Sequence, residues 1–168
     1  LQSLRVTFVS KNEQFDTSTA IGEAMLKIVL VFAELERNMT SERVTATMIS
    51  RANNGQWNGG RIPFGYSYDS GTSTFSIRED EAVVCRRLKD LYLDNKSLVY
   101  TARALNADGY KTRAGADWTP TAVWIIASSP FYAGIYRYNR YKGTENRTLN
   151  PEEEWVMIPD HHPAIFTL

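Results

Sequence analysis

A proline-free stretch from about Ala20 to Asn54 is the feature that most constrains the fold of this 168-residue chain. Gly55 follows two asparagines at its end, and a glycine in that place is a typical helix stop. We therefore predict one helix over the whole stretch, roughly 50 Å long at 1.5 Å per residue. A helix of that length cannot bury all of its surface in one small domain, so part of it needs a partner.

The two halves of this predicted helix differ in character. Residues from Ala24 to Leu35 are apolar nearly all round, which favours burial on several sides. Beyond Glu36 the pattern becomes amphipathic. Periodicity leaves two interpretations open: a coiled-coil or bundle arm, and an arm that dimerises through one side and lays the other side on DNA. The apolar side would carry Phe32, Leu35, Met39, Ala46 and Ile49, and the opposite side Arg37, Thr40, Ser41, Thr47 and Arg51.

Short elements separated by turn signals follow the helix. Glycine-rich residues 56–65 are typical of an extended linker. Ser97 is a good capping residue, and the pair Thr119-Pro120 combines a capping hydroxyl with a proline in the first turn. The pattern predicts strands at 4–9, 132–141 and 155–158, a hairpin at 64–77, and helices at 79–93, 98–107 and 120–128.

These elements indicate an α+β architecture that is mainly α-helical. We expect a strand and the long helix in residues 1–55, a linker over 56–65, and a compact domain with short β-strands over 66–168.

Charge is distributed unevenly along the chain. The formal net charge is zero, which taken alone argues against a nucleic-acid partner. Basic residues nevertheless outnumber acidic ones between Arg37 and Tyr66 and between Lys96 and Lys142, whereas the segment from Gly143 onward is acidic. Such asymmetry suggests a basic face.

Several classes of site find no support in the sequence. Cys85 is the only cysteine, so neither a disulfide framework nor a cysteine-rich zinc site is expected. His161 and His162 are adjacent and lack a third ligand nearby. No phosphate-binding glycine loop is present, and the apolar stretch ending at Leu35 is too short to span a bilayer. We expect no metal, no cofactor, no membrane association and a cytoplasmic location.

The helices at 98–107 and 120–128 fit a helix-turn-helix pair whose second helix reads DNA. Its inward face would hold Val123, Ile126 and Ala127. The loop between the helices is longer than a standard turn and is basic, and an ordinary helical domain with a basic loop remains an equal alternative. The outward face would show the short or apolar side chains of Thr121, Ala122, Ile125 and Ser128, which suit thymine methyl groups.

Strings spread over the whole chain resemble the large serine recombinases, the family of serine integrases and related transposon recombinases. Each string is weak, but their order and spacing make the match specific. They are Val6-Thr7-Phe8-Val9-Ser10, Asp16-Thr17-Ser18-Thr19, Phe32-Ala33-Glu34-Leu35-Glu36-Arg37, Ser41-Glu42-Arg43-Val44, Gly59-Gly60-Arg61-Ile62-Pro63-Phe64-Gly65-Tyr66, Ala104-Leu105-Asn106-Ala107-Asp108-Gly109, Trp118, Ser129-Pro130-Phe131-Tyr132-Ala133-Gly134, Trp155 and His162-Pro163-Ala164-Ile165.

The resemblance implies site-specific recombination of DNA, as in integration and excision of mobile elements. A serine near the N-terminus of such enzymes attacks a phosphodiester and forms a phosphoserine link, and a tetramer exchanges the half-sites. That serine and the cysteine-rich zinc ribbon lie outside the matched strings. We therefore expect a DNA-binding fragment that does not cleave, with the recombinase domain truncated at its C-terminus. Glu36 and Arg37 match the family's Glu-Arg pair near the active site.

The expected partners are a double-stranded attachment site and further copies of the chain: a dimer, and a tetramer in the synapse of the intact protein. One rival hypothesis is a helix-turn-helix transcription regulator whose long helix serves only for dimerisation, and another is a structural dimer with no nucleic-acid role. The residues expected to contact DNA are Arg37, Arg43, Arg51, Arg61, Lys111, Arg113, Thr121, Ile125, Arg137 and Arg140.

Overall fold

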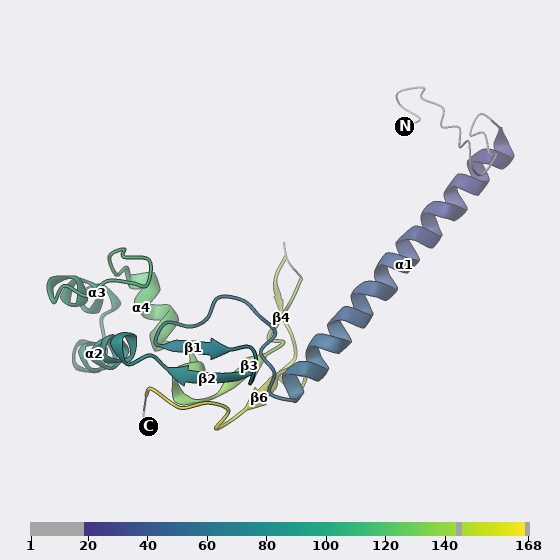
Figure 1. Cartoon of the computed structure of the whole chain (residues 1–168). Helices are drawn as coiled ribbons and strands as arrows, with labels where there is room; N and C mark the ends of the chain where they lie inside the picture. Colours follow the sequence, from purple (N-terminus) through teal and green to yellow (C-terminus); the bar gives the residue numbers. More distant parts are fainter. Residues whose placement is uncertain (1–18, 144–145, 167–168) are drawn as a thin grey trace. The chain divides into compact units, whose positions relative to one another are not determined.

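The computed structural model describes residues 19–143 and 146–166 (Figure 1). The strand expected at 4–9 lies outside these residues. The helices are α1 (Ala20–Asn53), α2 (Glu79–Asn95), α3 (Leu98–Ala107) and α4 (Pro120–Ala127), with two short 3-10 helices, η2 (Pro130–Ala133) and η3 (Glu152–Glu154). The strands are β1 (Tyr66–Asp69), β2 (Thr74–Ile77), β3 (Tyr136–Tyr138), β4 (Tyr141–Lys142), β5 (Thr148–Leu149) and β6 (Val156–Ile158). The α+β, mainly helical prediction is confirmed.

Helix α1 forms over nearly the whole predicted stretch. The amide of Gly22 donates to the hydroxyl of Thr19 at 3.0 Å, which caps the helix start. Gly55 takes a left-handed conformation with φ +70° and ends the helix. The boundary between two compact units of the chain falls inside α1, after Thr47. Among the described residues, no helix combines the length and the apolar character needed to cross a membrane.

In the first unit, the apolar side chains of α1 have no cover within the described residues. Phe32 is 65% exposed, and Ile28, Leu35 and Met39 are each about half exposed. Exposed apolar area of this extent usually marks a contact surface.

In the second unit, helices α2, α3 and α4 pack together around fully buried Leu88, Leu105 and Val123. Figure 1 shows these three helices grouped at one end of the unit and the strands at the other. Each fully buried leucine of this kind contributes about 1.5–3 kcal/mol of apolar burial. The inward positions follow the helical period of the sequence.

The second half of the core is aromatic. The hairpin of β1 and β2 pairs Tyr66 with Ile77 in antiparallel register. Tyr66 is fully buried, and its hydroxyl donates to the carbonyl of Pro163 at 2.9 Å. Burial raises the pKa of this hydroxyl to about 12. The rings of Phe75 and Phe131 lie edge-on to Tyr66 at centroid distances of 6.3 and 5.2 Å.

Residues 56–65 form no helix or strand, but this segment packs against the second unit and is not a detached linker. Trp57, Ile62 and Phe64 are partly buried and pack against the core of the second unit. The Trp57 ring lies edge-on to Phe75 with centroids 5.3 Å apart. Three apolar anchors in ten residues hold this segment along the domain surface.

The prediction of a strand over 132–141 was wrong for its first residues. They belong instead to η2, which begins at Pro130 and ends before Gly134, whose φ is +80°. A Cβ at Gly134 would lie 2.9 Å from the carbonyl oxygen of His162, so the close approach requires glycine. Strand β3 pairs with β6, and β4 pairs with β5 after a bend at Asn139, whose φ is +60°. The alternating aromatic residues gave a strand-like pattern that local turn chemistry interrupts.

Candidate nucleic-acid interface

Local capping signals set the ends of helices α3 and α4. The Ser97 hydroxyl accepts from the amide of Tyr100 at 3.2 Å, and the Thr119 hydroxyl accepts from the amide of Ala122 at 3.2 Å. Pro120 occupies the first turn of α4, where its missing N–H has no cost. Both starts were predicted from the sequence.

The loop between the two helices is ordered by side-chain hydrogen bonds. Asn106 donates to the carbonyl of Trp118 at 3.0 Å and accepts from its amide at 2.7 Å. The hydroxyl and the amide of Thr112 both donate to the carbonyl of Ala116, at 3.1 and 2.9 Å. These bonds give the loop between α3 and α4 a defined structure and fix how α4 leaves it.

Helix α4 buries one side and exposes the other. Val123 and Ile126 lie in the core, as predicted, and Ala122 and Ala127 are half-buried. Thr121 and Ser128 are exposed, and Ile125 is 56% exposed. Trp124 is also 56% exposed, which the sequence reasoning missed. An exposed indole beside an exposed isoleucine gives α4 an apolar outer surface.

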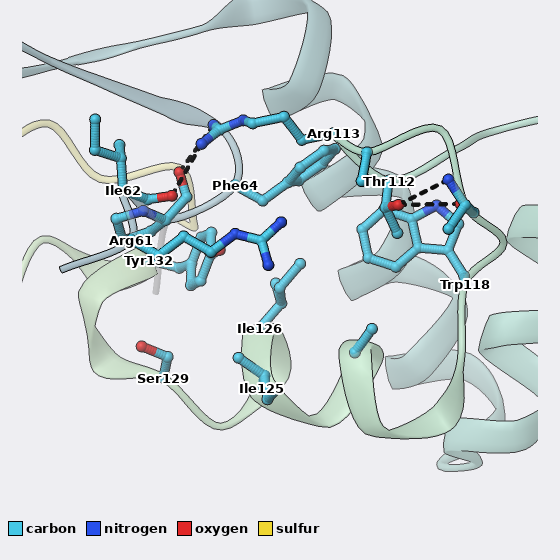
Figure 2. A pocket seen from close by; sticks show the side chains of 14 residues that line it. Arg61, Ile62, Phe64, Thr112, Arg113, Trp118, Ile125, Ile126, Ser129 and Tyr132 are labelled. Carbon is cyan, nitrogen blue, oxygen red and sulfur yellow. Dashed lines mark hydrogen bonds between the residues drawn. The ribbon is translucent and has the colours of Figure 1, made fainter.

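A cavity of about 540 Å³ lies between α4, the loop at 112–118 and the segment at 61–64. Phe64, Trp118 and Tyr132 supply much of its apolar lining, together with Ile125 and Ile126 of α4. Figure 2 shows the side chain of Arg61 extended over this cavity toward Ile126. No carboxylate among the described residues lies within 4.0 Å of the Arg61 guanidinium.

Arg113 has a different environment, because its donors are already used. Its Nε donates to Glu81 at 2.7 Å, its Nη1 to the carbonyl of Ile62 at 2.9 Å, and its Nη2 to the carbonyls of Pro63 and Tyr66 at 3.1 and 3.0 Å. The Arg113 and Glu81 side chains are 28% and 8% exposed. Figure 2 shows the bonds from Arg113 to the segment at 62–63.

Glu81 is the acidic partner of this pair. Burial alone raises the pKa of its carboxyl, but hydrogen bonds from Arg113 and from the Gly65 amide, at 2.7 Å, outweigh burial and lower that pKa below its usual value. The charged pair ties α2 to the segment at 62–66. Sequence reasoning missed Glu81, since the two charges stand 32 residues apart.

The other predicted contact residues occupy several places. Lys111 forms an exposed ion pair with Asp117 across the loop. Arg37 and Arg43 are exposed on α1, and Glu36 is exposed beside Arg37. In the second unit, Arg51 donates to the side-chain oxygen of Asn58 at 3.2 Å. Arg137 lies on β3, and Arg140 directly precedes β4.

His161 and His162, the adjacent pair for which no metal role was expected, form hydrogen bonds within the protein. Their Nδ1 atoms lie 2.9 Å apart, and their Nε2 atoms lie 2.7 Å from the carbonyls of Gly55 and Phe131. Burial is the main cause that lowers the pKa of His162. No group of three potential metal ligands occurs within the described residues.

Comparison with known protein families places this geometry in context. The family model described as "Recombinase" matches residues 79–168, which is more than half of the chain. The model described as "Resolvase, N terminal domain" matches residues 1–57. No solved structure matches the chain. This chain belongs to the site-specific serine recombinases.

Proposed function

We propose that this chain is the DNA-binding part of a site-specific serine recombinase and that α3, its ordered loop and α4 act as a helix-turn-helix. The observation that carries the proposal is the exposed outer face of α4, beside Arg61, which has no carboxylate partner among the described residues. Trp124 and Ile125 are each more than half exposed there, and Arg61 reaches over the adjacent cavity.

The outer face of α4 suits contact with bases in the major groove. Thr121 lies in the first turn, and recognition helices commonly meet base edges with their N-terminal residues. Thr121 and Ile125 offer methyl groups to thymine, and this contact distinguishes thymine from the other bases. Trp124 enlarges the apolar area on the same surface.

Phosphate contacts fall to Arg61 and Lys111 in this proposal. Arg61 has no carboxylate partner in the part of the chain that the structure describes, and the exposed pair of Lys111 with Asp117 is weak enough to exchange for a phosphate. Arg113 acts indirectly, because its donors hold the carbonyls of Ile62 and Pro63 and so place the neighbouring Arg61. Phosphate contacts of this kind set register and carry no direct sequence information.

Helix α1 has two roles in this proposal: contact with DNA and association with other protein. Arg37, Arg43 and Arg51 contact the DNA backbone, with Glu36 and Arg37 close to the active site of the assembled enzyme. The exposed apolar side chains of α1 associate with a second copy of the chain or with a catalytic domain. We assign residues 1–55 to the end of the catalytic domain, 56–65 to a connecting segment and 66–168 to the DNA-binding domain.

Selection of duplexes from a random-sequence pool tests this proposal. The chain should enrich a sequence motif, and Thr121→Glu should reduce discrimination between the enriched duplex and random DNA. Thr74→Glu, at an exposed threonine on β2, is the matched control and should keep most of that discrimination. No covalent protein–DNA adduct should form with the enriched duplex. Failure to enrich any motif, or equal loss from both variants, would contradict the recognition role of α4.

A further inference from the structure

The C-terminal strands carry a row of alternating arginine and aromatic side chains: Arg137, Trp155, Arg140, Tyr141 and Arg147, here called the arginine ladder. The guanidinium carbons of Arg137 and Arg140 lie 6.0 and 4.9 Å from the Trp155 ring centre. Those of Arg140 and Arg147 lie 5.1 and 4.9 Å from the Tyr141 ring centre. Three positive charges are therefore held together on two rings.

A buried asparagine, Asn150, holds the Trp155 ring of the ladder in place. Trp155 Nε1 donates to the carbonyl of Asn150 at 2.9 Å. The Asn150 side chain is 4% exposed and donates to the carbonyl of Asn139 at 2.8 Å, at the bend between β3 and β4. The Asn150 amide also donates to the carbonyl of Arg140 at 2.9 Å. The stacking surface is thus organised before any ligand arrives.

No acidic side chain of the described residues neutralises the ladder. None of its guanidinium groups has a carboxylate within 4.0 Å in residues 19–143 and 146–166. Burial, and next the positive charge of Arg140, lower the pKa of Arg137. Arg140 Nε is buried and has no acceptor among the same residues. Like charges packed this closely repel, and an anion relieves that repulsion.

We propose that the arginine ladder binds the phosphodiester backbone of duplex DNA, as a contact separate from α4 on the same domain. The inference rests on the proposed function, because it takes DNA as the ligand. Stacking holds each guanidinium by its face and leaves edge N–H groups for phosphate oxygens, a geometry that lysine does not offer. Tyr141 is 43% exposed, and Arg147 and Lys142 are exposed beside it, so the outer end of the ladder is open to a large ligand.

The test is the salt dependence of binding to a random-sequence duplex and to the duplex that the chain selects. Arg147→Ala should reduce the slope of log affinity against log salt by about 0.9 for the one phosphate lost. It should weaken both duplexes by the same factor, since a backbone contact is blind to sequence. Arg147→Lys should restore most of the slope. Tyr141→Ala, which removes the stacking ring but no charge, should weaken both duplexes by a smaller common factor.

Arg86→Ala is the matched control, because Arg86 is a half-buried arginine of the same unit whose guanidinium is paired with Glu79 at 3.1 and 3.2 Å. It should leave the slope unchanged. If the unmodified chain binds duplexes but Arg147→Ala and Tyr141→Ala behave like Arg86→Ala, the ladder serves another ligand, such as an acidic protein, and only this inference falls. Loss confined to the selected duplex would overturn the backbone assignment. A chain that binds no duplex would overturn the proposed function and the ladder with it.

Discussion

Nε, Nη1 and Nη2 of Arg113 all donate to acceptors within the second unit, and Glu81 receives two of those bonds. The Glu81 side chain is only 8% exposed, so removing Arg113 is costly, because it leaves a buried carboxylate unpaired. Arg61 differs, because it is exposed and has no carboxylate partner among residues 19–143 and 146–166. Two arginines that look alike in the sequence therefore have different environments, and we expect them to have different roles.

Substitution separates those two roles. Arg113→Ala should lower the free energy of unfolding by about 3–5 kcal/mol, because it leaves the buried Glu81 carboxylate without its ion-pair partner. Arg61→Ala should change that free energy by less than about 0.5 kcal/mol, as surface substitutions usually do, and should flatten the salt dependence of DNA binding. Urea unfolding measures the first quantity and a binding titration the second. Equal effects of both substitutions on stability would refute the distinction.

The charge of Glu81 also predicts a dependence of stability on pH. Its pKa is lower in the folded chain than in the unfolded chain, so its contribution is complete above the unfolded value of about 4.3 and is lost as pH falls through the folded value. Glu81→Gln should destabilise the chain by about 1–3 kcal/mol at neutral pH. The difference from the unmodified chain should shrink steadily below pH of about 4.

Glu79→Gln provides the control for that experiment, since Glu79 is 70% exposed and forms only a surface ion pair with Arg86. Its effect on stability should stay within about 1 kcal/mol. The free energy of unfolding of each variant is measured from neutral to acid pH. If Glu81→Gln differs from the unmodified chain by the same free energy at every pH, the carboxylate charge contributes nothing to stability.

Cys85 gives a second test at the residue scale. Burial raises the pKa of its thiol to about 12, and the side chain is fully buried. Only the thiolate reacts readily, so labelling by an aromatic disulfide should be slow in the native chain and fast in denaturant. Rapid labelling of the folded chain would place Cys85 at the surface and contradict the packing of α2.

At the scale of elements, local signals explain what the sequence could predict. The cap at Ser97, the pair Thr119-Pro120 and the glycine after α1 each act within one turn of the helix they bound. By contrast, the ion pair of Arg113 with Glu81 joins residues 32 positions apart, and the hydrogen bond from Asn106 to Trp118 joins residues 12 positions apart. No local pattern encodes such contacts, so they appear only in the folded chain.

The same distinction applies to the surface of α4. The helical period predicted that Val123 and Ile126 face the core, and both are buried. The period did not predict the exposure of Trp124, because large apolar residues are usually placed inside when only a pattern is available. The rotation of α4 that exposes Trp124 follows from its packing against α2 and α3.

Helix α1 carries its own prediction. Its exposed apolar side chains should drive association of the chain at high concentration. Phe32→Lys should weaken that association, because it places a charge in the contact. Thr40→Lys is the control: it adds the same charge on the side of α1 expected to face DNA, and it should leave the association of the chain unchanged. Sedimentation equilibrium measures both. A strict monomer at high concentration would contradict the association.

At the scale of the whole molecule, a net charge of zero conceals a division of charge. Acidic side chains of the second unit are partly used inside it, as with Glu81, while Arg61 and the arginine ladder have no carboxylate partner among the described residues. The family assignment accounts for why such a chain has unpaired arginines, because its members act on DNA. Total charge therefore says less about a nucleic-acid partner than the pairing of individual charges.

The most direct test of this account is the affinity of the chain for duplex DNA, measured at several salt concentrations. Each phosphate contact releases counterions, so log affinity should fall with log salt by about 0.9 per contact. The account predicts a steep slope equal to several contacts, made by Arg61 and the arginine ladder among others. A slope near zero, or no binding at low salt, would contradict the claim that these arginines face DNA.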